Sequence, residues 1–168
     1  MKGGSVMTRH RARISLVLAG LAGMLVSLAG LRALEPAEQG ALARRVIRPE
    51  KAPNTGLPFS PGILVGNTLY VAGHLGRDPV SSKLVAGGIE AETRQALNNI
   101  REVLEAAGMD LTNVASVTVY ITSFADFARF NAVYREFFPA NPPARATVQV
   151  AALNDGARVE LQMIAVRP

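Results

Sequence analysis

Two short runs of apolar and β-branched residues begin the hydrophobic pattern of the chain. They cover residues 63–65 and 68–72, and the dipeptide Gly66-Asn67 separates them. Such a dipeptide is typical of a two-residue turn between antiparallel strands. We therefore predict that a β-hairpin opens the fold.

A helix and a strand are expected after this hairpin. Between residues 89 and 107, apolar residues recur at the spacing of one helical face, and Gly108 provides a C-terminal stop. From residue 117 to residue 122, apolar and polar residues alternate strictly. This period of two predicts a strand with one buried face.

The next segment predicts a second helix with an aromatic face. Ser123 is suited to be its N-cap, Asp126 follows three residues later, and Pro139 would end the helix. The aromatic residues fall at i, i+3, i+7 and i+10, and we interpret them as a core face: Phe127, Phe130, Tyr134 and Phe137.

Two further β-prone runs, residues 146–152 and 159–166, end the chain. The turn-forming residues 153–156 between them predict a second hairpin. The element order is then ββ-α-β-α-ββ, an α+β fold in which a mixed sheet carries both helices on one face. The other face of the last strand carries Arg158, Glu160 and Gln162, and such a polar face is expected to meet either other subunits or a water-filled cavity.

The N-terminus has the pattern of a secretory signal or a membrane anchor. Residues 14–31 carry no charge and follow a basic run at residues 9–13. We expect residues 1–34 to be a signal peptide or a transmembrane anchor, and the protein to be exported to the periplasm or held at the membrane. Residues 35–57 are expected to be an irregular linker, and residues 58–168 the folded domain.

The basic charge of the chain lies largely in this N-terminal segment. The first 34 residues hold five of the 18 lysine and arginine side chains and none of the 13 acidic ones, so residues 35–168 carry 13 of each. A neutral domain lacks the clustered cations that neutralise phosphates, so we expect no nucleic-acid partner. The chain has no cysteine, which excludes disulfides, thiol nucleophiles and thiolate metal sites.

The remaining side chains disfavour several other chemistries. His74 is the one histidine after the N-terminal segment, so neither a histidine metal cluster nor a Ser-His-Asp triad is expected. The lysines of the same region, Lys51 and Lys83, fall in loop-like segments, which disfavours a pyridoxal Schiff base. We expect neither a metal nor a cofactor.

Arg145 is the most suggestive polar residue. It comes shortly after Pro142-Pro143, and such a stiff approach would hold a guanidinium well for bidentate binding of a carboxylate. The residues alone leave two interpretations open for Arg145, and equally for Glu160: a group that binds substrate, or an ordinary surface charge.

Several motifs together resemble the RidA/YjgF family. Residues 141–150 and 159–166 are similar to the C-terminal signature of that family, and the resemblance runs from about residue 58 to residue 167. Shorter matches lie at Phe59-Ser60, at residues 71–74, at Asp126-Phe127, at Asn131 and at Tyr134.

This resemblance implies a chorismate mutase-like α+β fold, a homotrimer, and active sites in clefts between subunits. It also implies hydrolysis of 2-imino acids, such as the 2-iminopropanoate derived from 2-aminoacrylate, to the 2-keto acid and ammonia, without a cofactor. In this resemblance Arg145 binds the substrate carboxylate and Glu160 handles water. The residues implied to contact substrate are Phe59, Gly73, His74, Asn131, Ala146 and Thr147.

Three of these residues depart from the family pattern. Phe59 lacks the hydroxyl of the usual tyrosine, Ala146 replaces a small polar residue, and His74 stands where glutamine is usual. Because an imidazole titrates near neutral pH, His74 is either a new acid or base or a structural residue.

The predicted second hairpin has a consequence for the site. If it turns at Asp155, Glu160 pairs near Val150, and Arg145 lies about five residues farther along the strand, roughly 16 Å away. One subunit then cannot bring both groups to one small substrate. Either they meet across a subunit boundary, or only one of them serves each site.

Two functions of different classes remain open on this basis. One is an imine deaminase. The alternative is a non-catalytic trimer that binds small carboxylate metabolites in the cleft between subunits. A ribonuclease-like activity is disfavoured by the neutral charge of residues 35–168.

Overall fold

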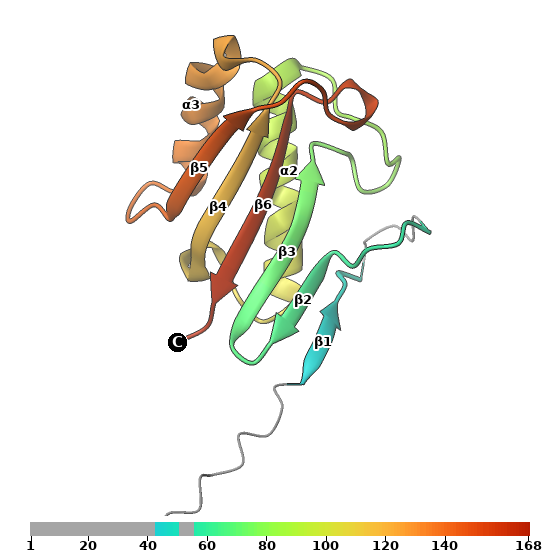
Figure 1. Cartoon of the computed structure of the whole chain (residues 1–168), viewed down its shortest axis with the longest axis vertical. Helices are drawn as coiled ribbons and strands as arrows, with labels where there is room; N and C mark the ends of the chain where they lie inside the picture. Colours follow the sequence, from blue (N-terminus) through green and yellow to red (C-terminus); the bar gives the residue numbers. More distant parts are fainter. Residues whose placement is uncertain (1–42, 51–55) are drawn as a thin grey trace, which may run out of the picture. The chain divides into compact units, whose positions relative to one another are not determined.

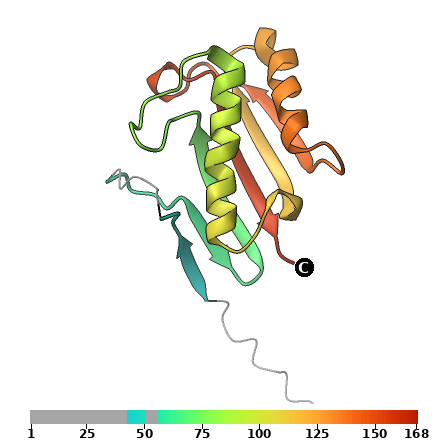
Figure 2. The ribbon, with the colours of Figure 1, turned by 180° about the vertical axis from the view of Figure 1, so that it is seen from behind.

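A six-stranded mixed sheet carries two helices on one of its faces in the computed structural model, which describes residues 43–50 and 56–168 (Figures 1 and 2). The strands lie side by side in the order β1-β2-β3-β6-β4-β5. The predicted α+β class, with both helices on one face, is confirmed. The elements are β1 (Arg44–Ile47), β2 (Gly62–Val65), β3 (Thr68–Leu75), α2 (Gly88–Ala106), β4 (Val114–Ile121), α3 (Phe127–Phe137), β5 (Ala144–Gln149) and β6 (Val159–Val166).

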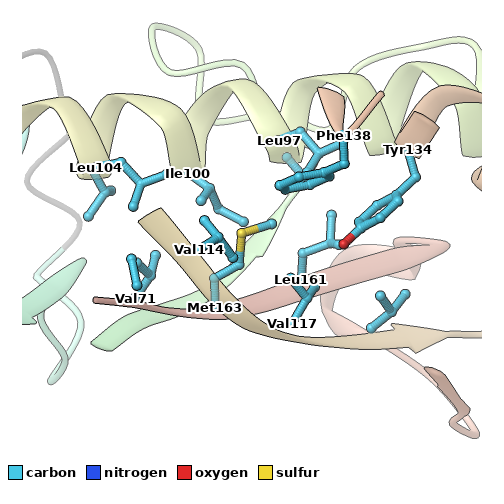
Figure 3. Close-up of a cluster of buried hydrophobic side chains, with 14 of the residues drawn as sticks. Val71, Leu97, Ile100, Leu104, Val114, Val117, Tyr134, Phe138, Leu161 and Met163 are labelled. Carbon is cyan, nitrogen blue, oxygen red and sulfur yellow. The ribbon is translucent and has the colours of Figure 1, made fainter. Parts of the chain in front are cut away.

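The hydrophobic core lies between the sheet and the helices. Alternate residues of β6, from Val159 to Ala165, are almost completely buried, whereas Glu160, Gln162 and Ile164 between them face away from the helices. Figure 3 shows strand side chains such as Leu161 packed toward α2 and α3. Other members of this cluster are Val71, Leu97, Ile100, Leu104, Val114, Val117, Tyr134, Phe138 and Met163.

Local signals in the sequence located most of these elements. The turn between β2 and β3 falls at Gly66-Asn67, where Gly66 has a φ of 58° that favours glycine. The helical spacing located α2, and strict alternation located β4. The predicted cap is correct in part, because the Ser123 hydroxyl accepts from the Ala125 N–H at a short 3₁₀ turn, one turn before α3 begins.

The predicted C-terminal hairpin is wrong. β5 pairs with β4 in parallel, and β6 runs antiparallel between β3 and β4, so β5 and β6 are not neighbours. The turn signal itself is real, because residues 154–156 form a 3₁₀ turn. A central position gives β6 hydrogen-bonded neighbours on both edges and buries its whole apolar face, which a terminal hairpin would not do.

β1 is a strand that the sequence pattern did not predict, and it lies within the expected linker, residues 35–57. It extends the sheet by pairing with β2, and Ile47 is its only buried residue. The element order is therefore β-ββ-α-β-α-ββ rather than ββ-α-β-α-ββ. The predicted leader, residues 1–34, lies outside the described residues. Within the described ranges, no helix combines the length and apolar character that a membrane span requires.

The corrected topology can be tested by engineered disulfides, because the chain has no cysteine of its own. Ala146, Thr118 and Gln162 form one row across β5, β4 and β6 on the face opposite the helices. Antiparallel partners lie about 5 Å apart between Cα atoms, within the reach of a disulfide. We expect the pair Thr118→Cys and Gln162→Cys to form an intramolecular disulfide, measured by peptide mass mapping.

The matched pair Ala146→Cys and Gln162→Cys should not form this bond, because two strand spacings place the Cα atoms about 10 Å apart. An intramolecular bond in the second pair, but not in the first, would contradict the strand order β6-β4-β5.

Candidate functional site

Arg145 lies on β5 with its guanidinium against the aromatic face of α3. The residue pairs with Val117 of β4, which is buried on the helix side of the sheet, so Arg145 points to the same side. Its Cζ atom lies 4.6 Å from the ring centroid of Tyr134 and 5.4 Å from that of Phe130. Among the described residues, no carboxylate forms an ion pair with this guanidinium.

A cavity of about 400 Å³ opens beside the Arg145 guanidinium. Asn131 of α3 lines it, and so do the two prolines that lead into β5. Asn141, with a φ of 48°, turns the chain just before these prolines. The other lining residues are Tyr134, Arg135 and Phe138. An unpaired cation beside an open cavity is suited to bind a carboxylate.

Glu160 lies in a second cavity, of about 680 Å³, at the end of β3. Gly73 sits beneath it: a Cβ atom built on Gly73 would overlap the Glu160 carboxylate, so glycine is the residue that leaves room for this carboxylate. Phe59 contributes a half-exposed aromatic ring, and Gln162 also lines this cavity. A bulge in the pairing of β3 with β6, between Val71 and His74, opens the strand at this point.

His74 is partly exposed as a residue, but its Nε2 atom is buried, and the ring is electrically neutral at neutral pH. Burial lowers its pKa to about 4, and a hydrogen bond that the ring donates to the Pro61 carbonyl opposes this shift only in part. Its Nε2 atom is buried and has no hydrogen-bond partner among the described residues. His74 lines the same cavity as Glu160, and its lowered pKa disfavours only the role of an acid at neutral pH, so both interpretations of His74 stay predictions.

Buried carboxylates fix the strand that carries Glu160. Glu92 of α2 accepts a hydrogen bond of 2.7 Å from the Arg158 backbone N–H, and Asp126 accepts one of 2.9 Å from the Arg158 guanidinium. Both carboxylate residues are only 6% exposed. Since Arg158 comes two residues before Glu160, these bonds hold the start of β6 against α2 and against the 3₁₀ turn that leads into α3.

Arg145 and Glu160 lie on opposite faces of the sheet. Arg145 pairs with Val117 and Glu160 with Tyr120, so they are three positions apart along the strands and two strands apart across the sheet. This register corresponds to about 14 Å between their Cα atoms. The hairpin argument for their separation was wrong, but the separation itself exists, because Arg145 faces α3 and Glu160 faces away from it.

The other predicted contact residues divide between the two faces. Thr147 shares the helix side with Arg145, and Ala146 lies on the opposite face, in one row with Thr118 and Gln162. Neither Ala146 nor Thr147 lines one of the two cavities. In the described part of the chain, no three histidine, aspartate or glutamate residues come together as a metal site.

Sequence analysis missed the aromatic support of Arg145. Phe127, Phe130 and Tyr134 were interpreted only as core residues, and they also stack against the guanidinium. The sequence contained a usable signal for this contact, because the aromatic face of the second helix lies against the start of the strand that carries Arg145.

Comparison with known proteins agrees with this geometry. Residues 49–167 match the family model described as endoribonuclease L-PSP. The chain is 49% identical over 127 residues to the 2-iminobutanoate/2-iminopropanoate deaminase of the goat, Capra hircus, covering 76% of this chain and 93% of that protein. The crystal structure of RidA from an Antarctic Psychrobacter has a TM-score of 0.70 and 39% identity, covering 73% of this chain and 99% of RidA. The YjgF protein of Escherichia coli has a TM-score of 0.70 and 34% identity, with coverages of 74% and 99%.

These relatives contradict the predicted export or membrane anchoring, and that prediction is wrong. The match covers 93% of the goat deaminase. The 7% of that protein outside the match is too short to hold a counterpart of residues 1–34. The apolar pattern of residues 14–31 was therefore not a sufficient basis for assigning a compartment.

The lowered pKa of His74 predicts a pH dependence of stability. The folded-state pKa of about 4 lies below the usual value of 6.5, so the unfolded chain takes up the proton first as the pH falls. The free energy of unfolding should therefore fall by up to about 3 kcal/mol through His74 between pH 6.5 and pH 4. Urea unfolding of the wild type and of His74→Gln across this range measures the contribution.

The His74→Gln variant cannot titrate at this position, so its stability should fall less steeply with acid than that of the wild type. Parallel curves for the two proteins would show that His74 is not held as a neutral ring.

Proposed function

This chain belongs to the RidA/YjgF family, and we propose that it hydrolyses 2-iminobutanoate, 2-iminopropanoate and similar 2-imino acids to the 2-keto acid and ammonia. It is an imine deaminase. The observation that carries this function is the Arg145 guanidinium, stacked on aromatic rings beside an open cavity and without an acidic partner among the described residues. The goat relative is named for the same two imines.

Arg145 binds the carboxylate of the imino acid. A guanidinium presents two parallel N–H donors, which match the two oxygens of a planar carboxylate. This contact places the neighbouring C=N carbon at a fixed position. Fixing the substrate in this way removes much of the entropic barrier to attack by water.

Glu160 orients water and takes up its proton. The water oxygen bonds to the C2 carbon of the imine, and the proton it loses passes to the Glu160 carboxylate. The nitrogen of the resulting carbinolamine takes this proton back from Glu160, and the C–N bond breaks as ammonia leaves. The C=O bond of the keto acid forms as the hydroxyl proton of the carbinolamine passes to the Glu160 carboxylate. A protonated imine is already electrophilic, so the protein needs only to orient the reactants and to transfer protons.

Arg145 and Glu160 come from different subunits of a homotrimer. Support comes from their position on opposite faces of one sheet, about 14 Å apart by register. The face opposite the helices also carries exposed apolar side chains, among them Tyr70, Val148 and Ile164. Such a face is suited to pack against another copy of the chain.

The carboxylate contact is tested with the full chain and an imine generated in situ from an amino acid by an oxidase. Arg145→Ala should lower kcat/KM at least a hundredfold, because it removes a bidentate charged contact. Arg145→Lys should recover only part of this loss, because an ammonium lacks the planar fork. Keto-acid formation is followed by coupled reduction, and wild-type activity in Arg145→Ala would exclude the assigned role.

Mixed trimers test the shared site. Arg145→Ala and Glu160→Gln trimers should each keep only a small residual activity, but equimolar co-refolding should restore activity in about a quarter of the sites, where an intact Arg145 meets an intact Glu160 of a neighbour. The two variants refolded separately and then combined serve as the control. If both groups acted within one subunit, co-refolding would restore nothing.

Gly73→Ala tests the position of the Glu160 carboxylate. The new Cβ occupies the place of this carboxylate, and a flexible side chain can move aside without disturbing the fold. We expect kcat to fall at least tenfold while the Tm stays within about 3 °C of the wild type. In a Glu160→Gln background the same substitution should have little further effect. An equal loss in both backgrounds would mean that Gly73 acts independently of Glu160.

A further inference from the structure

Three aromatic rings on consecutive turns of α3 surround one face of the Arg145 guanidinium. The ring centroids of Tyr134, Phe130 and Phe127 lie 4.6, 5.4 and 5.8 Å from its Cζ atom. All three distances are within the range of a cation–π contact. We call these three residues the aromatic platform.

The platform is rigid, whereas Arg145 stands on an exposed strand. Phe130 is fully buried and Tyr134 is 5% exposed. The rings of Phe130 and Tyr134 also pack against each other, 5.6 Å apart between centroids. Arg145 is exposed, and a free arginine side chain has large rotational freedom. Because pairing with Val117 fixes only its backbone, the rings are what restrain its side chain.

The hydroxyl of Tyr134 takes no part in this contact. It is buried and has no hydrogen-bond partner among the described residues. Figure 3 shows it directed away from α3 toward the sheet, on the side of Leu161. Burial raises the pKa of Tyr134 to about 12, partly offset by the charge of Arg145, so the phenol stays neutral. The ring face is therefore the part of Tyr134 that Arg145 uses.

We infer that Tyr134 is a positioning residue for carboxylate binding: its ring, with those of Phe130 and Phe127, fixes the plane of the Arg145 guanidinium so that its donor edge faces the cavity lined by Asn131 and Pro143. This inference rests on the proposed function. One face of the guanidinium is shielded from water by the rings, which strengthens the attraction of its N–H edge for an anion.

Tyr134→Leu removes the ring and keeps an apolar side chain of similar reach. We expect its KM for 2-iminopropanoate to rise roughly 3- to 30-fold, the range of a cation–π contact, with kcat within about twofold of the wild type. Tyr134→Phe keeps the ring and should retain the wild-type KM. An unchanged KM in Tyr134→Leu, or an equal rise in both variants, would overturn the inference.

Phe137→Leu is the matched control for lost packing. Phe137 belongs to the same helix and packs against the core, but neither the platform nor the Arg145 cavity includes it. It should lower the Tm without raising KM, whereas a raised KM here would assign the Tyr134 effect to general loosening of α3. If Tyr134→Leu does not fold, Phe127→Leu removes the partly buried member of the platform and should raise KM in the same direction.

Binding of pyruvate, the product carboxylate, separates this inference from the proposed function. Calorimetry should show weaker pyruvate binding by Tyr134→Leu than by the wild type and by Tyr134→Phe. If the wild type does not hydrolyse imines but shows this pattern, the proposed function fails and the positioning role stands. Equal pyruvate affinity in all three proteins would exclude the positioning role, whatever the activity.

Discussion

The central position of β6 is the constraint on which the rest of the structure depends. This strand pairs on both edges, with β3 and β4, and buries alternate residues from Val159 to Ala165 beneath the helices. Because side chains alternate with a period of two, a slip of one residue would turn Glu160 into the core and expose Leu161. Burial of the apolar face therefore determines which way Glu160 points, and bonds to Arg158 from α2 and from the 3₁₀ turn before α3 fix where β6 begins.

The same alternation keeps the two functional groups of one subunit apart. Arg145 belongs to the row of side chains that face α3, and Glu160 belongs to the row that faces away. Each group lines a cavity of its own, so each cavity holds only one of the two groups that the proposed hydrolysis uses. Because the helices cover one face of the sheet, the other face is available to contact a neighbouring subunit. In the proposed trimer, this contact brings Arg145 of one subunit to Glu160 of another.

Sequence patterns predicted the positions of the helices and strands well, but they predicted poorly which strands pair with each other. The bounds of β6 and the turn at Gly66-Asn67 follow from local periodicity, which a sequence displays directly. The parallel pairing of β5 with β4 depends on contacts between distant segments, and no local pattern near Asp155 distinguishes it from a hairpin. β1 escaped notice because it is four residues long with one buried side chain.

For the candidate site, the family motifs are what singled out Arg145 and Glu160 as candidates, because local chemistry alone does not separate them from surface charges; their roles stay predictions. The motifs did not indicate that the two residues lie on opposite faces of the sheet, because the face on which each side chain lies depends on the strand order. The neutral state of His74 was equally hidden, since burial and not residue type lowers its pKa.

The position of β5 has a consequence for the behaviour of the protein at high concentration. β5 is the last strand of the sheet, and its outer edge presents backbone donors and acceptors that no other described strand pairs with. Such an edge is a template for uncontrolled strand addition, and β5 has neither a proline nor a lysine to discourage it. The strand that carries Arg145 is thus also a site for aggregation in a lone subunit, so in the proposed trimer a delay in assembly would deplete the protein as well as leave it inactive.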